Sequence, residues 1–232
     1  MKKFEIVFEK VCSSTNDIAK ELPPYTAVYA ERQTNGRGRM GRSWQDGLGN
    51  LMTSIVLPKP KQAQLFSFLA SLAVAQSIAF LSPRIKWPND ILIDNKKVCG
   101  ILLETFNDKL IIGIGVNIEN HPNGGTLYPT TCLKEHGRAV EAKTLLSEIL
   151  QNLSFLIECF DKKGFEPIRM DWLEFACGIG QPITVNLPNK SVEGIFSGLN
   201  ENGALILTNK NQTQFITAGD VFMIDEKKDK NE

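Results

Sequence analysis

Apolar and polar positions change their spacing several times along this chain of 232 residues, and each change marks a predicted element. Short runs that alternate or stay apolar, rich in β-branched and aromatic residues, are typical of strands. We predict strands at residues 4–8, 26–31, 51–58, 84–87, 91–93, 98–106 and 110–118. The last two are expected to pair antiparallel, and "DNKK" predicts a tight turn just before them.

Longer stretches show the apolar period of helices. Ser14 and its two neighbours are candidate N-caps for a short helix that runs to Leu22. Residues 62–81 contain the most apolar stretch, but Ser and Gln residues interrupt it, so we predict a buried helix and not a membrane span. Two further helices are predicted at residues 141–160 and at about 166–177, after a polar loop at residues 120–139.

The pattern changes at Gly178, where short strand-like segments alternate with turn residues. We predict strands at residues 181–187, 191–199, 203–208 and 213–224, which together suggest a small β-barrel. The expected organisation is a body of helices and strands at residues 1–177, a β-barrel domain at 178–226 and a disordered, charged tail at 227–232.

Composition narrows the function classes. Lys plus Arg and Asp plus Glu each number 26, so the net charge is zero and gives no overall attraction to nucleic acids or membranes. Five scattered cysteines without a C-x-x-C motif indicate reduced thiols, and the N-terminus has no signal-peptide pattern. We therefore expect a cytoplasmic protein. The two histidines lack metal-ligand spacing, so no protein-held metal site is expected.

The stretch "GRGRMGR", residues 36–42, matches the dinucleotide-binding spacing G-x-G-x-x-G. That motif requires a helix directly after the glycines and an acidic residue about twenty positions on. Here "RSWQDGLGN" has no helical period, and "PKPKQ" lies near the acidic position, so we exclude a dinucleotide fold. No Walker or kinase signature occurs. Two alternatives to an anion-binding loop stay open: a surface loop with solvated arginines, and an RNA-binding Arg–Gly segment.

Further clusters restrict the choice. "KWPND" at residues 86–90 is a stiff turn that brings together a cation, an indole, an amide and a carboxylate. "KKVCGIL" places Lys97 near a glycine, and "GIGVNI" ends an apolar strand in Asn117. Together with "STN" at residues 14–16 and "GRGRMGRSW", these motifs resemble biotin protein ligases over residues 12–225. Lipoate ligases are similar in fold but differ in these motifs.

The resemblance implies an α+β fold: a mixed, mostly antiparallel sheet packed with helices, like class II synthetases, plus a small C-terminal SH3-like barrel. It implies that biotin and ATP, with Mg²⁺, form biotinyl-5′-AMP, and that a lysine of a biotin carboxyl carrier protein of acetyl-CoA carboxylase then accepts the biotin. Family members that repress transcription carry an N-terminal helix-turn-helix domain; this chain begins at the catalytic domain, so we expect no DNA binding. Monomer and homodimer both remain open.

The resemblance also implies the site residues. Biotin would contact Ser14, Thr15, Asn16, Gln33, Gly36, Arg37, Gly38, Arg39, Lys97 and Gly100. ATP would contact Arg37, Arg39, Arg42, Trp44, Lys86, Asn89 and Asn117. The catalytic set would be Arg39, Lys97 and Asp90. Arginine suits the task because its planar guanidinium bonds two anionic oxygens at once.

Alternatives remain for single residues and for the function. Trp44 stacks on adenine or plugs the folded loop, Lys86 binds nucleotide or forms a structural ion pair, and Asp90 acts on the incoming lysine or caps its turn. Met40 stands where family members often have a basic residue, so no charge chemistry is expected there. For the whole protein, a lipoate or octanoate ligase and a non-enzymatic RNA-binding module are the other hypotheses.

Overall fold

The fold is known from a computed structural model that describes residues 2–45, 47–210 and 212–224. Its larger sheet has seven strands in the order β1-β2-β3-β7-β6-β5-β4. Strands β1 (Glu5–Cys12) and β2 (Thr26–Gln33) are parallel, and the short helix α1 (Thr15–Glu21) connects them. From β2 onward, neighbouring strands are antiparallel. These further strands are β3 (Leu51–Pro58), β7 (Lys109–Val116), β6 (Lys96–Phe106), β5 (Asp90–Ile93) and β4 (Arg84–Lys86). The predicted mixed, mostly antiparallel sheet is confirmed.

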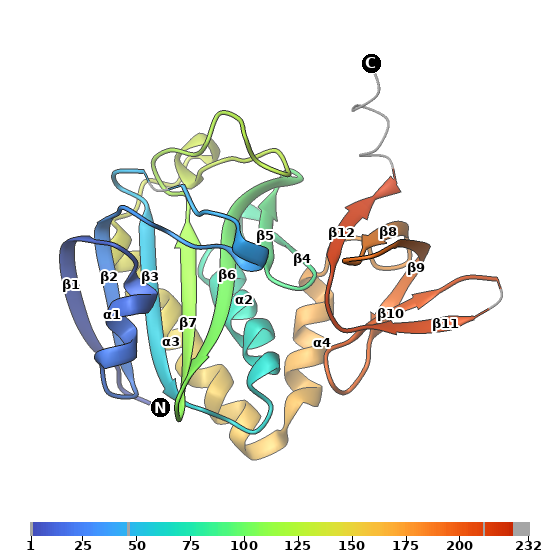
Figure 1. The fold of residues 1–232 in the computed structure, drawn as a ribbon, viewed down its shortest axis with the longest axis horizontal. Helices are drawn as coiled ribbons and strands as arrows, with labels where there is room; N and C mark the ends of the chain where they lie inside the picture. The colour runs from blue at the N-terminus through green and yellow to red at the C-terminus, as the bar shows by residue number, and fades with distance from the viewer. Residues whose placement is uncertain (1, 46, 211, 225–232) are drawn as a thin grey trace.

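Side-chain alternation divides this sheet into two faces. Ala27, Ile55 and Ile112 belong to the large core with the helices α2 (Phe66–Ser77), α3 (Ala142–Lys163) and α4 (Phe165–Phe175). Their sequence neighbours Val28 and Val56 join Ala19 of α1 in a smaller cluster. Successive strand residues point to opposite faces, so α1 covers one face and the long helices cover the other (Figure 1).

Helix α2 explains the most apolar stretch of the sequence. All of its residues except Gln76 are buried, as expected for a helix that is apolar on every side. It is shorter than predicted, because 3₁₀ turns at Ala63–Leu65 and Ala79–Leu81 flank it. Among the described residues, no helix combines the length and apolar character needed to cross a membrane.

The turn predicted at "DNKK" joins β5 to β6. Asp94 and Asn95 have φ values of 49° and 60°, the left-handed conformation that both central residues of a type I′ hairpin turn need. Aspartate and asparagine tolerate this conformation better than other side-chain-bearing residues. The turn sets the register in which β6 presents Lys97 beside β5.

The C-terminal part forms a second sheet, of five antiparallel strands in the order β11-β10-β9-β8-β12. The strands are β8 (Pro182–Asn186), β9 (Ser191–Leu199), β10 (Leu205–Thr208), β11 (Thr213–Ile216) and β12 (Asp220–Met223). The single strand predicted at 213–224 was wrong: β11 and β12 separate before Gly219, whose φ is 159°, and they pair at opposite ends of the sheet. In the described residues these two outer strands are not hydrogen-bonded neighbours, so the predicted barrel is observed as an open five-stranded sheet. The predicted tail at 227–232 lies outside the described residues.

Candidate active site

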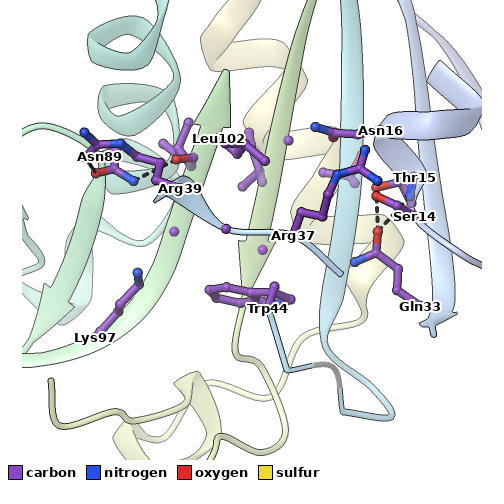
Figure 2. Close-up of a pocket in the computed structure, with 17 residues that line it drawn as sticks. Ser14, Thr15, Asn16, Gln33, Arg37, Arg39, Trp44, Asn89, Lys97 and Leu102 are labelled. Atoms are coloured by element: carbon purple, nitrogen blue, oxygen red, sulfur yellow. Dashed lines mark hydrogen bonds between the residues drawn. The ribbon is translucent and has the colours of Figure 1, made fainter. Parts of the chain in front are cut away.

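Two adjoining cavities lie on the sheet face that carries α1, beneath a loop of residues 34–45 that we call the clamp loop. The first cavity is bounded by the start of α1, the end of β2, and strands β6 and β7. The second reaches the loop at residues 122–130 and the start of β12. Both cavities are lined by Gly38, Arg39, Trp44, Asn89 and Lys97, so they adjoin at these residues and together form one two-part site. Figure 2 shows the residues that line the first cavity.

Buried polar groups form the end of the first cavity near α1. The backbone N–H and the hydroxyl of Thr15 both donate to Oε1 of Gln33, at 2.7 and 3.0 Å. The Ser54 hydroxyl lies 2.7 Å from the hydroxyl of Thr15 and also contacts Oδ1 of Asn16. Ser14 is the N-cap residue, but its side chain makes no cap hydrogen bond. This network gives one end of the cavity fixed donors and acceptors, which is how sites orient a polar ring.

The clamp loop folds back on itself. The N–H of Trp44 donates to the Gly36 carbonyl at 2.9 Å, and the N–H of Gly38 donates to the Arg42 carbonyl at 2.6 Å. A Cβ atom on Gly36 would lie 2.6 Å from the Trp44 carbonyl oxygen, so only glycine permits this approach. Met40, at the tip of the loop, is 65% exposed.

Arg39 stands at the junction of the two cavities. Its Nη1 donates to Oδ1 of Asn89 at 2.7 Å, and Asn89 donates through Nδ2 to the Ile101 carbonyl at 2.8 Å. Burial lowers the pKa of the Arg39 guanidinium from its ordinary value, yet arginine stays protonated in proteins. A partly desolvated cation bonded to a neutral amide is available to an anion that enters either cavity.

Lys97 and Asp90 form an ion pair in the same region. Nζ of Lys97 lies 2.7 Å from Oδ1 of Asp90, which comes from the neighbouring strand β5. A Cβ atom on Gly100 would lie 3.1 Å from that Nζ, so the glycine keeps the space beside the ammonium open.

Trp44 fills much of the first cavity. Its indole lies against Gly100 and Gly115, which pair in register on β6 and β7, and a Cβ atom on Gly115 would clash with the ring. The remaining cavity volume is about 60 Å³. The indole Nε1 is buried and has no hydrogen-bond partner among the described residues.

The second cavity is larger, about 320 Å³, and carries most of the residues expected at the nucleotide. Asn117 is buried there; its Nδ2 donates to the Thr131 carbonyl at 3.0 Å, while its Oδ1 has no hydrogen-bond partner within the described chain. Arg42 reaches the second sheet, with Nη2 3.0 Å from Oδ1 of Asp220.

Lys86 is placed differently from the other expected nucleotide contacts. It is 5% exposed, and its Nζ lies 3.2 Å from the ring centroid of Tyr128 and 5.3 Å from that of Phe222. It lines neither the first nor the second cavity. Tyr128 lines the second cavity, and its ring lies between that cavity and the Lys86 ammonium.

Several residues of the site escaped the sequence analysis. The guanidinium of Arg37 is bonded to Asp17 and Glu104, and Thr53 lines the first cavity. Ser54, Glu104 and the glycines Gly113 and Gly115 sit at alternate or register-paired strand positions on the face of Val56 and Ile111. Strand alternation from a residue known to face α1 is the signal that finds them.

An α+β architecture with a two-part cavity, polar at one end and cationic at the junction, defines a small-molecule enzyme site. Comparison with known proteins gives the family. The Biotin/lipoate A/B protein ligase family profile matches residues 8–118, and the biotin protein ligase C-terminal domain profile matches residues 178–223. The chain is 34% identical to a biotin–[acetyl-CoA-carboxylase] ligase of Paracoccus denitrificans, with 90% of this chain and 96% of that protein covered.

Two further relatives support the assignment. A bifunctional ligase/repressor of Bacillus subtilis is 34% identical, over 93% of this chain and 73% of that protein. The solved biotin protein ligase from Aquifex aeolicus in complex with biotin and ATP superimposes with a TM-score of 0.86 at 28% identity, covering 94% of this chain and 97% of that one. The chain belongs to the biotin/lipoate A/B protein ligase family.

Proposed function

We propose that this chain is a biotin protein ligase, which activates biotin with ATP and transfers it to a lysine of a carrier protein. The observation that carries the proposal is the continuity of the two cavities through Arg39 and Lys97, in a chain whose relatives bear this activity by name. Biotin and ATP would occupy neighbouring cavities, with the reacting carboxylate and α-phosphate meeting at the two cations.

The polar end of the first cavity favours biotin over lipoate or octanoate. The ureido ring of biotin has two N–H donors and one carbonyl acceptor, which match the hydroxyl, amide and backbone groups around Thr15, Gln33 and Asn16. Biotin can exchange hydrogen bonds with this network when it binds, whereas a dithiolane or alkyl chain offers the network no hydrogen bond.

In the first step, the biotin carboxylate attacks the α-phosphorus of ATP, forming the acyl-adenylate as the bond to the bridging oxygen of pyrophosphate breaks. The reactants are both anionic, so Arg39 and Lys97 lower the barrier by bonding the oxygens on which negative charge increases. Folding of the clamp loop over the product excludes water from the mixed anhydride. Trp44, Arg42 and Asn117 are the nucleotide contacts of this proposal.

In the second step, the lysine amine of the carrier attacks the biotinyl carbonyl, giving an amide and AMP. The amine must be neutral, although a free lysine titrates near ~10.4. Asp90 is the carboxylate at the junction of the two cavities. We propose that it orients this amine and accepts its proton, while Lys97 stays bonded to the phosphate of the departing AMP.

Mg²⁺ would accompany ATP. The described residues hold no group of three or more His, Cys, Asp or Glu side chains arranged for a metal. Mg²⁺ commonly binds through substrate phosphates and water with few protein ligands, and the free Oδ1 of Asn117 fits such a supporting role. The ion would supply neutralisation of phosphate charge.

We extend the proposal to the organisation and partners of the chain. The two sheets support a division near residue 177 into a catalytic part and a small β-domain. The carrier is expected to be that of acetyl-CoA carboxylase, and five cysteines that form no disulfide suit the cytoplasm. Monomer and homodimer remain the two expected states.

The proposed function is tested by transfer. The protein is incubated with ATP, Mg²⁺ and a carrier domain, and biotin, lipoate or octanoate is supplied in separate reactions. The mass of the carrier domain is then measured by intact mass spectrometry. We expect a biotin adduct that is absent when the acceptor lysine is replaced by arginine. A lipoyl or octanoyl adduct without a biotinyl one would replace the proposal with the other ligase.

A further inference from the structure

Two arginines of the clamp loop have opposite surroundings. In the part of the chain that the structure describes, the Arg39 guanidinium makes a single hydrogen bond, to the neutral amide of Asn89. Arg37 donates from Nη1 and Nη2 to the two carboxylate oxygens of Asp17, at 2.8 and 2.9 Å. A second carboxylate, that of Glu104, lies 3.5 Å from its Nη2. An anion can bond the remaining N–H donors of Arg39 beside one neutral amide, whereas the charge of Arg37 is already matched by a bidentate carboxylate.

The acidic partners of Arg37 are themselves fixed to the wall of the first cavity. Asp17 lies in the first turn of α1, next to Asn16. Glu104 accepts a hydrogen bond of 2.8 Å from Nδ2 of Asn16, whose Oδ1 is bonded by Ser54. Arg37 therefore joins the clamp loop to the same α1 and β6 residues that shape the biotin end of the site.

The position of Arg37 determines the position of the rest of the clamp loop, because backbone contacts connect the two. Arg37 and Ser43 form an isolated antiparallel bridge, and the flanking Gly36–Trp44 and Gly38–Arg42 hydrogen bonds tie the two limbs together. Arg39 lies at the tip of this short hairpin, and Trp44 lies at its base. An anchor at Arg37 thus sets the positions of the cation and of the indole that cover the ligand.

Building on the proposed function, we propose that Asp17, assisted by Glu104, is a positioning residue that holds Arg37 as the anchor of the clamp loop. The loop then meets the ligand's anionic groups through Arg39 and through backbone N–H groups, and the Arg37 guanidinium is not a ligand contact. The ionisation states agree: the hydrogen bonds from Arg37, and then those from Lys20, hold the pKa of Asp17 well below its ordinary value. The bond to Asp17 raises the pKa of Arg37.

The test is a mutant cycle of Asp17→Asn, Arg37→Gln and the double variant, with Glu21→Gln at the exposed end of α1 as the matched control. Each variant is assayed for the KM of biotin, for kcat at saturating biotin, and for the half-life of the bound adenylate. We expect each single variant to raise KM and shorten the half-life by about twofold to fivefold, the scale of a partly exposed ion pair, with a smaller effect on kcat. The double variant should have the same KM and adenylate half-life as either single variant. Asp17→Glu should restore both values most of the way to those of the wild type.

A second measurement, hydrogen exchange, tests the anchor without relying on enzymatic activity. Hydrogen exchange of the backbone amides of residues 36–44 is measured in ligand-free protein, where Asp17→Asn and Arg37→Gln should both speed exchange and Glu21→Gln should not. An Arg37→Gln loss that Asp17→Asn does not share, or losses that multiply in the double variant, would overturn the anchor and return Arg37 to the ligand. Failure of the proposed function would appear as a wild-type protein inactive with biotin, and the exchange result would still decide the anchor.

Discussion

Nζ of Lys97 on β6 lies 2.7 Å from Oδ1 of Asp90 on β5, at the junction where the two cavities meet. A register shift between Ile91 and Leu92 sets this approach, because it pairs Leu92 with Lys97 while Ile91 pairs with Cys99. A cation is thereby held on the sheet within reach of both cavities, independently of the clamp loop. The proposed adenylation chemistry depends on this position of the Lys97 ammonium.

Replacing Lys97 by alanine removes the cation but little of the core, since the side chain is 23% exposed and lines the cavities. Loss of one such charge-stabilising donor is expected to slow adenylation by about 10²–10³-fold. Pyrophosphate release at saturating biotin and ATP measures the rate, and urea unfolding measures stability. Lys96→Ala, at the exposed neighbouring position, is the control. Normal pyrophosphate release from Lys97→Ala would remove Lys97 from the mechanism.

Replacing Arg39 by glycine should weaken retention of the adenylate more than its formation. Arg39 lines both cavities, and among the described residues its guanidinium is hydrogen-bonded to Asn89 alone, so the variant loses a phosphate partner without breaking an ion pair. We expect labelled biotinyl-adenylate to leave the enzyme about tenfold faster or more in rapid filtration. Met40→Ala, at an exposed position of the same turn, should retain the intermediate. Equal release from Arg39→Gly and wild type would contradict the clamp.

Trp44 should report ligand entry. Its indole occupies the first cavity, which leaves about 60 Å³, so a bicyclic ligand with its side chain requires the ring to shift. The other two tryptophans, Trp87 and Trp172, are buried in the core and donate to the Gly203 carbonyl and to Ser71. We expect a change in tryptophan fluorescence on biotin addition that Trp44→Phe abolishes. A signal that survives in Trp44→Phe would mean that the indole does not move.

The Asp17–Arg37 pair has a defined pH dependence. The pKa of Asp17 is lowered in the folded protein, so the pair's stabilisation is present above the unfolded pKa of about 3.9 and is lost as pH falls through the folded value. Both side chains are partly exposed, so its size should be about 0.2–1 kcal/mol. Urea unfolding of wild type and Asp17→Asn should differ by a constant amount from about pH 5 to 8, and the difference should shrink below about pH 4. A difference that instead grew toward low pH would be inconsistent with the pair.

Much of the fold follows from local signals. The apolar runs that became β3, β6 and β7, and the Asp94–Asn95 turn, are specified by residues close in sequence. The break at Gly219 was missed because "TQFITAGDVFMI" is apolar on both sides of it, and only the pairing partners show two strands. Pairing across the sheet is a long-range property that a local pattern does not contain.

Some site residues could likewise be predicted from local motifs, whereas others depend on distant parts of the chain. Thr15, Arg39, Asn89 and Lys97 lie in motifs and line the cavities, as does Gln33, which only the family resemblance implied. Glu104 and Ser54 stand in ordinary strand sequence, and their roles arise from neighbours 88 and 38 residues away. Lys86 lies in a motif, yet the ring of Tyr128 covers it, because a residue type alone does not reveal what packs above it.

The most direct test of the central claim is pyrophosphate release from ATP and Mg²⁺ by the wild-type protein, with biotin, lipoate or octanoate added separately and no carrier present. We expect release with biotin alone, up to one equivalent per site, because the adenylate stays bound beneath Arg39 and the clamp loop. Release with lipoate or octanoate and not with biotin, or release with none of the three, would contradict it.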